Sequence, residues 1–250
     1  MSGHSKWSTI KHKKAASDAK KGKEFTRASN LISLAAKAGG DPAMNPALAL
    51  AIEKAKSVNM PKANIERAIK KGTGELGGSA IEETIYEGYG PEGVAILIES
   101  ATDNKNRTVS EVRSTLTKHG GSMASAGSVS FIFKRQGQIE IEKSSPSLPE
   151  ERIEEIIIDS GAIDFETEDG KILIYTDPKD LMKIKNNFED NDLIVSSAEM
   201  VYIPTSEVTI SEKEKIEKII RLIDSLEELD DITNVYSNLN ISDEVMKELG

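Results

Sequence analysis

The chain has 250 residues, of which 38% are hydrophobic and 30% charged, and its formal net charge is −10. This hydrophobic content excludes an intrinsically disordered chain, and the length predicts more than one domain. No apolar run reaches the roughly 18 residues of a membrane span, the start lacks a secretory signal, and the absence of cysteine excludes disulfides and thiolate metal sites.

The charge is unevenly distributed along the chain. Residues 1–78 hold 15 Lys and Arg against 6 Asp and Glu, whereas residues 79–250 hold 17 against 36. The two parts therefore carry net charges of +9 and −19. A basic segment joined to an acidic remainder is typical of a domain that binds a polyanion. A Lys-rich, merely solvated helical surface is the alternative, and the size of the imbalance favours binding.

The first 78 residues predict an extended basic arm followed by three short helices. Apolar residues recur at spacings of three and four from Ser17 onward, and Gly39 ends this first helix. Asn45 is expected to cap the second helix, and Pro61 to open a third that ends near Gly72. The glycines of residues 72–78 match a dinucleotide-binding pattern, but a helix precedes them where that pattern needs a strand, so we interpret them as a linker.

Beyond the linker the hydrophobic period changes to two, which predicts a mixture of strands and helices. In chain order we expect strands at 84–89 and 94–100, a helix opened by Thr108 with Glu111 as its capping box, a strand with Val129, Phe131 and Phe133, a turn at 135–138, and a strand through Ile139 and Ile141. There follow a helix with Ile153, Ile156 and Ile157 ended by Gly161, a hairpin turn at Asp169-Gly170, a helix from Asp177-Pro178, and a strand at 193–203. A capping box of Ser211 and Glu214 then opens a long helix before a strand at 232–236.

This order of elements predicts an α+β protein of three domains. Residues 1–78 form a basic helical nucleic-acid-binding domain, and residues 79–134 with 205–250 form an α+β domain. A second α+β domain, residues 135–204, is inserted in it, and each α+β domain has the ferredoxin-like split βαβ pattern. Three sequential units remain an open alternative.

The residues needed for catalysis or for a metal site are scarce. The three histidines, His4, His12 and His119, lack metal-binding spacing, and no phosphate-binding loop, nucleophile elbow or zinc motif is present. The carboxylates of the helix at 150–159 are typical of a solvated face. We therefore expect no enzyme, no metal and no cofactor.

Candidate nucleic-acid-binding residues are concentrated near the start of the chain. Seven lysines fall between residues 6 and 25, where they would neutralise phosphates, and Trp7 could stack on an unpaired base or anchor the arm to the helices. The candidates are Lys6, Trp7, Lys11, His12, Lys13, Lys14, Lys20, Lys21, Lys23 and Arg27.

A second polar cluster lies between a predicted strand and a predicted helix. Its members are Asp103, Asn104, Lys105, Asn106 and Arg107. Such a loop could recognise phosphate at a helix entrance, but local turn and capping chemistry is the alternative that the residues themselves favour.

Three segments, SGHSKWSTIKHKK, YEGYGPEG and TDNKNRT, closely resemble the YebC family, and the resemblance covers the whole chain. The family includes bacterial proteins and mitochondrial translational activators. The resemblance implies three domains and nucleic-acid contacts from residues 6–14 and from the loop at 103–107. It also implies either DNA-binding transcriptional regulation or help to the ribosome at difficult sequences such as proline runs.

We therefore expect a cytoplasmic, monomeric regulator of gene expression that binds ribosomal RNA in preference to promoter DNA. A flexible Lys-rich arm suits irregular RNA, whereas the three predicted helices are rich in Ala and Lys and poor in base-reading side chains. The alternatives are a DNA-binding transcriptional regulator and, from another class, a protein-interaction adaptor that uses the acidic domains.

Overall fold

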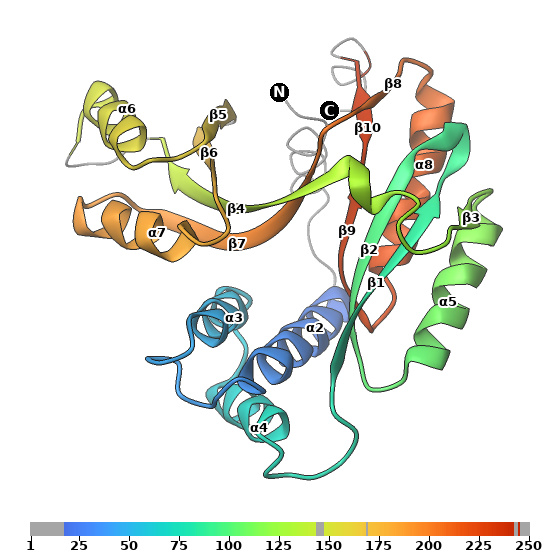
Figure 1. The fold of residues 1–250 in the computed structure, drawn as a ribbon, viewed down its shortest axis with the longest axis horizontal. Coiled ribbons are helices and arrows are strands. Elements are labelled where there is room, and N and C mark those ends of the chain that lie inside the picture. The colour runs from blue at the N-terminus through green and yellow to red at the C-terminus, as the bar shows by residue number, and fades with distance from the viewer. Residues whose placement is uncertain (1–17, 144–147, 169, 243–244, 246–250) are drawn as a thin grey trace. The chain divides into compact units, whose positions relative to one another are not determined.

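The computed structural model describes residues 18–143, 148–168, 170–242 and 245 (Figure 1). The chain forms two compact units. The smaller unit comprises Lys134–Ile203, and the larger one contains the described residues before and after it. None of the helices in the described part of the chain has the length and apolar character that a membrane crossing requires.

Three helices at the start of the larger unit pack around an apolar core. Their bounds are Asp18–Ala36 (α2), Pro46–Ser57 (α3) and Lys62–Gly72 (α4). α2 contacts both other helices, and Ile32 and Leu48 are fully buried because apolar residues recur every three or four positions. The predicted three-helix segment is thus confirmed, and residues 18–78 are called the helical head.

Asn45 connects two helices of the head. Its side-chain oxygen accepts a hydrogen bond from the backbone N–H of Leu48 at 3.1 Å, which confirms the predicted N-cap of α3. Its amide nitrogen donates to the carbonyl oxygens of Ala35 and Gly39 at 2.8 and 2.9 Å. One side chain therefore fixes both the start of α3 and its position against the end of α2.

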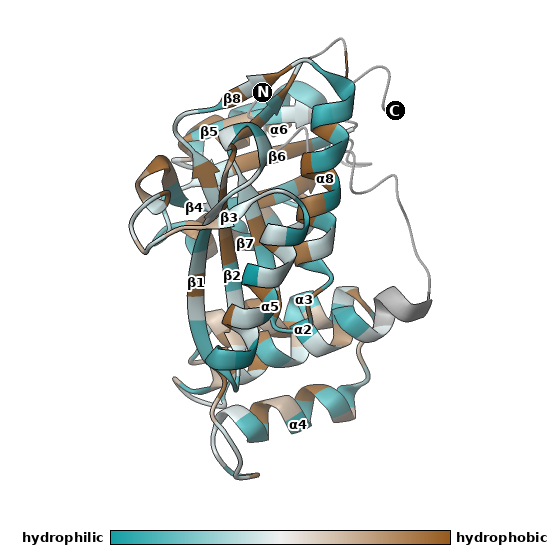
Figure 2. Cartoon of the chain, turned by 90° about the vertical axis from the view of Figure 1, so that its right-hand side faces the viewer, coloured by the Kyte–Doolittle hydropathy of each residue, from teal (hydrophilic) through white to brown (hydrophobic). Residues whose placement is uncertain are grey.

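A four-stranded antiparallel sheet forms the rest of the larger unit, in the order β3-β1-β2-β9. Helices α5 and α8 contact this sheet and each other, and both lie in front of it in Figure 2. Ile96 and Ile98 of β2 lie in the same apolar core as Leu116 of α5 and Ile219 of α8. The elements are β1 (Glu82–Tyr89), β2 (Ala95–Thr102), α5 (Lys105–Lys118), β3 (Ser122–Met123), α8 (Lys213–Glu227) and β9 (Ile232–Ser237). Two short strands, β8 (Val208–Ile210) before α8 and β10 (Leu239–Ile241) after β9, form a separate parallel pair.

The smaller unit is a second four-stranded sheet with two helices, in the order β5-β6-β4-β7. Its helices bury Ile153, Ile157 and Phe188, and the central strands bury Ile139 and Ile174. The elements are β4 (Phe133–Glu142), α6 (Glu150–Asp159), β5 (Asp164–Glu168), β6 (Lys171–Thr176), α7 (Leu181–Asp190) and β7 (Val195–Pro204).

Both sheets contain a split βαβ connection. In the larger unit β1 lies between β2 and β3, which α5 connects, and in the smaller unit β6 lies between β4 and β5, which α6 connects. The predicted α+β class is therefore confirmed. The division into domains at 1–78, 79–134 with 205–250, and 135–204 stays a prediction.

The structure corrects the predicted strand and turn between residues 129 and 138. Residues Ser130–Ile132 form a 3₁₀ turn, and Phe131 is 76% exposed, so alternation of Val129, Phe131 and Phe133 does not mark a strand. The predicted turn at 135–138 is also wrong, because β4 runs through it. Gly137 is not a turn glycine: a Cβ at this position would lie 2.3 Å from the hydroxyl oxygen of Thr176, so its small size allows β4 to approach β6.

Two predicted helix caps are also wrong. α5 begins three residues before Thr108, because the side chain of Asn104 accepts a hydrogen bond from the N–H of Arg107 and caps the helix there. Ser211 does not cap α8, which begins after Glu212 without a side-chain cap; the ammonium of Lys215 bonds Glu212 at 2.7 Å in that first turn. The helix predicted to begin at Asp177-Pro178 also begins later: residues 178–180 form a turn, and α7 starts at Leu181.

Candidate nucleic-acid interface

The basic arm lies outside the described residues. This applies to Lys6, Trp7, Lys11, His12, Lys13 and Lys14. Lys20 and Lys21 belong to the first turn of α2, and the structure describes their backbone only. The part of the predicted interface whose side chains can be followed therefore begins at Lys23.

Two of the predicted segments meet in one surface hollow, although about 80 residues separate them in sequence. Lys23 of α2 lines this hollow together with Asp103 and Arg107 from the start of α5. We call it the junction hollow. The described residues that line it are Lys23, Thr26, Asn30, Lys71, Ile81, Asp103, Arg107, Glu111, Glu228, Leu229, Asp230 and Asp231. Cations and carboxylates are mixed here, so the hollow is not by itself a simple anion site.

The cations of α2 contact the acidic segment that connects α8 to β9. The ammonium of Lys23 donates to the carbonyl oxygen of Glu228 at 2.8 Å. Burial lowers the pKa of the Arg27 guanidinium, while the neighbouring carboxylates, Glu227 foremost, act in the opposite direction. Asn30 adds a hydrogen bond to the carbonyl oxygen of Ala101 at 3.1 Å. Lys23 thus bonds the helical head to the segment that follows α8, and Arg27 lies close to the carboxylates of that segment. The role of both residues in nucleic-acid binding stays a prediction.

Asp231 organises the other side of the junction hollow. This carboxylate is only 6% exposed, and it accepts hydrogen bonds from both Arg107 Nη2, at 2.8 Å, and the hydroxyl of Thr108, at 2.7 Å. The hydroxyl of Thr102 donates to it as well, at 3.0 Å. The bond to Asp231 raises the pKa of Arg107 above its ordinary value. Arg107 is therefore a fixed cation whose position is set by a buried carboxylate 124 residues away.

The remaining residues of the loop at 103–107 mostly shape the start of α5. Asp103 pairs with Arg107 at 3.2 Å, Asn104 provides the cap, and Lys105 pairs with Glu82 at 2.6 Å. The bond to Lys105 lowers the pKa of Glu82. The side chain of Asn106 makes no hydrogen bond with another described residue. These contacts are the local turn chemistry that the residues alone favour, and phosphate recognition by this loop stays a prediction.

Sequence reasoning overlooked the basic residues of α3 and α4. Lys54, Lys56, Lys62, Arg67 and Lys70 are exposed, and Lys71 lines the junction hollow. Residues 18–78 carry 11 Lys and Arg against 6 Asp and Glu, so the helical head holds +5 of the +9 found over residues 1–78. These residues could have been found from the sequence by counting charges over the whole of residues 1–78 and not only in the lysine cluster at 6–25.

The described residues contain no group of three or more His, Asp or Glu side chains arranged to hold a metal ion. His119 ends α5, where its backbone N–H bonds the carbonyl oxygen of Leu116. The buried Glu87 accepts three backbone hydrogen bonds, so it is a structural carboxylate.

Comparison with known proteins gives consistent matches along the chain. Residues 5–75 match the family model described as TACO1/YebC protein N-terminal domain, and residues 81–239 match the one described as TACO1/YebC second and third domain. A protein of Acidithiobacillus ferrooxidans is 53% identical over 250 residues, covering 100% of this chain and 98% of that protein. One of Persephonella marina is 49% identical over 251 residues and covers 100% of both. Both carry the name "Probable transcriptional regulatory protein".

A solved structure has a similar fold. The crystal structure of a conserved hypothetical protein from Aquifex aeolicus is 44% identical in sequence, with a TM-score of 0.83. The match covers 91% of this chain and 93% of that chain. The arrangement of helices and sheets described above is therefore shared across most of both chains.

Proposed function

This chain belongs to the TACO1/YebC family, and on that premise we propose that it is a regulator of gene expression that binds nucleic acid through its basic N-terminal segment. The observation that supports the proposal best is the charge of residues 1–78, +9 on a protein whose remainder carries −19. Phosphate neutralisation by Lys and Arg supplies most of the affinity of non-specific nucleic-acid binding. The names of the relatives agree with regulation of gene expression.

The proposed target is ribosomal RNA, with assistance to translation at difficult sequences such as proline runs. A DNA-reading helix needs free Arg, Asn or Gln side chains along one face. On α2, Asn30 bonds a carbonyl oxygen of β2 and Arg27 is partly buried, so neither is free to read bases. This proposal includes a cytoplasmic monomer that needs no cofactor.

The second candidate is a DNA-binding transcriptional regulator. The names of the curated relatives favour it. The exposed side chains of Asn64 and Arg67 on α4 are residues that could contact base edges.

The test is co-sedimentation of the full chain with ribosomes, beside binding to random duplex DNA at matched salt. The binding variant carries Lys11→Glu, Lys13→Glu and Lys14→Glu. A matched control carries Lys179→Glu, Lys183→Glu and Lys218→Glu, three exposed lysines that form no ion pair with other described residues. The charge change is the same in both.

Ribosome binding that outlasts DNA binding as salt rises, and that is lost in the arm variant but kept in the control, is the expected result. Sequence-selective DNA binding without ribosome association would replace the translational role by the transcriptional one. Binding that survives reversal of the arm lysines would instead favour an adaptor that uses its acidic surface.

A further inference from the structure

Helix α5 carries a surface whose charge differs from that of the acidic part of the chain around it. Its 14 residues include four cations and one carboxylate, Glu111, whereas residues 79–250 as a whole carry −19. Lys105 and Arg107 form ion pairs at the start of the helix. Arg113 and Lys118, farther along, are exposed and pair with no carboxylate of the described residues.

On other helices some cations pair with carboxylates of the same helix, whereas others, such as Lys183 of α7 and Lys218 of α8, form no ion pair with a described residue. α4, α6, α7 and α8 each contain an ion pair between residues three or four positions apart. Such pairs are typical of a helix face that is only solvated. Lys118 lies in the last turn of α5, where a cation is favourable to the helix dipole, but Arg113 lies in the middle and has no such structural reason.

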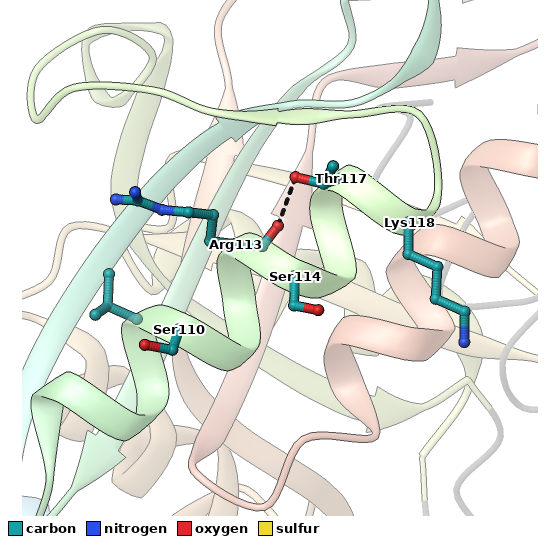
Figure 3. Close-up of a pocket in the computed structure, with 6 residues that line it drawn as sticks. Ser110, Arg113, Ser114, Thr117 and Lys118 are labelled. Carbon is teal, nitrogen blue, oxygen red and sulfur yellow. Dashed lines mark hydrogen bonds between the residues drawn. The ribbon is translucent and has the colours of Figure 1, made fainter.

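Small hydroxyl side chains occupy the surface between these two cations. Ser110, Ser114 and Thr117 follow one another at spacings of four and three, so they form one stripe on the outward side of α5. Figure 3 shows Arg113 and Lys118 extending to opposite sides of this stripe. The same residues line a shallow surface hollow.

The hydroxyls have little structural value where they lie. Ser and Thr form helices less readily than Ala, Glu, Lys or Gln, any of which an exposed position would accept. Ser110 and Thr117 bond back to carbonyl oxygens of their own helix, and the hydroxyl of Ser114 bonds no other described residue. An exposed stripe that departs from helix preference without a local gain indicates a functional surface.

We propose that this face of α5 is a second contact for the sugar–phosphate backbone of the nucleic acid that the basic N-terminal segment binds; the inference rests on the proposed function. Arg113 and Lys118 are five positions apart, about 7.5 Å along the helix axis, and extend to opposite sides of the stripe, so a strand that crosses the stripe can meet both cations. Hydroxyls between them are small enough for the backbone to approach and able to bond phosphate oxygens.

The face connects to the rest of the interface through the start of the same helix. Arg107, Glu111, Ser114 and Lys118 recur at spacings of four, three and four, so one ridge of α5 runs from the junction hollow to Lys118. Lys23 and Lys71 of the helical head line the same hollow. A strand held by the head could therefore continue along α5, with the carboxylate of Glu111 at the edge of its path.

The test measures binding of a labelled single-stranded RNA of mixed sequence to the full chain at several salt concentrations. The variant Arg113→Gln with Lys118→Gln removes two cations, and Lys218→Gln with Arg221→Gln removes two from the exposed face of α8 as a matched control. We expect the first to lower the slope of log affinity against log salt by about 1.4, because each contact to a single strand contributes about 0.7. The control should keep the slope, and so should Arg113→Lys with Lys118→Arg, which preserves both charges.

Equal slopes and affinities for the α5 variant and the α8 control would overturn the second contact, while loss of binding in the Lys11, Lys13 and Lys14 variant would still support the first. If the wild-type chain binds the RNA without salt dependence, the proposed function itself fails. Thermal unfolding of each variant shows whether a loss of binding reflects a loss of folding.

Discussion

Glu87 is a carboxylate that is 6% exposed on a central strand and yet has a reason to stay ionised. Burial acts to raise its pKa, but hydrogen bonds from the backbone N–H groups of Val129, Gly127 and Ser130, at 2.6, 2.7 and 3.0 Å, more than offset this, and the pKa lies below its ordinary value. One side chain thus fixes the loop that connects β3 to β4.

Replacing Glu87 by Gln should destabilise the chain by about 1–3 kcal/mol at neutral pH, because an amide is a weaker acceptor and leaves backbone donors poorly satisfied. A depressed folded-state pKa contributes stability above the unfolded-state value, and this contribution is lost as the pH falls through the folded-state value. The difference in unfolding free energy between wild type and Glu87→Gln should therefore become smaller at acidic pH. Thermal or urea unfolding across pH measures it.

The control is Glu83→Gln on the same strand, where the carboxylate is exposed and makes no ion pair with a described residue. It should leave stability nearly unchanged at every pH. A gap between wild type and Glu87→Gln that stays constant down to acidic pH would contradict the assignment of Glu87 as an ionised acceptor.

At the scale of elements, the helices of the head could be predicted because their signals are local. The cap at Asn45 and the Pro that precedes α4 are contained in a few residues of sequence, and the structure has them as expected. The 3₁₀ turn at Ser130–Ile132 could not be predicted, because the N–H groups of Ser130 and of Val129 before it bond the side chain of Glu87, more than 40 residues away. Strands of two or three residues such as β3 are too short to produce a recognisable alternation.

The candidate site divides in the same way. The lysine cluster near the start can be predicted from the sequence, and so can the turn and capping bonds of the loop at 103–107. The convergence of Lys23 with Arg107 is not, because it depends on how α2 packs against the sheet. The face of α5 also escaped prediction, since only the structure shows that Arg113 and Lys118 lack partners among the described residues.

Gly72 lies where α4 packs tightly against α2 in the head. A Cβ here would lie 2.3 Å from the carbonyl oxygen of Ser33 and 2.7 Å from the Cβ of Ala36, so α4 would have to move away from α2. We expect Gly72→Ala to destabilise the chain by about 1–3 kcal/mol, the usual cost of overpacking. Chemical unfolding followed by circular dichroism measures this change.

Gly22→Ala is the matched control in the same head, since a Cβ there meets nothing within 4 Å. Replacing a glycine within a helix by Ala stabilises a protein by about 0.5–1 kcal/mol when the Cβ has room, so the stability changes of the two substitutions should have opposite signs. Equal effects of the two would show that α2 and α4 do not approach each other as closely as the structure has them.

At the scale of the whole larger unit, cations of the basic head lie beside carboxylates of the acidic sheet domain. Lys23 and Arg27 of α2 lie against Glu227, Glu228 and Asp230, which follow one another where α8 ends. The same acidic segment includes Asp231, which holds Arg107. This acidic segment therefore borders the head and, through Asp231, fixes Arg107 at the start of α5.

This arrangement predicts the effect of Arg27→Glu. The new carboxylate would join four others, Glu24, Glu227, Glu228 and Asp230, in a partly buried place where like charges repel strongly. Backbone amides in the middle of α2 should then exchange with solvent deuterium faster, while those of β4 and β6 in the smaller unit keep their protection. Lys56→Glu, an exposed position of α3, changes the charge by the same amount and should leave α2 protected. Equal exchange in the two variants would mean that the head is held by its apolar contacts and that the acidic segment does not align it.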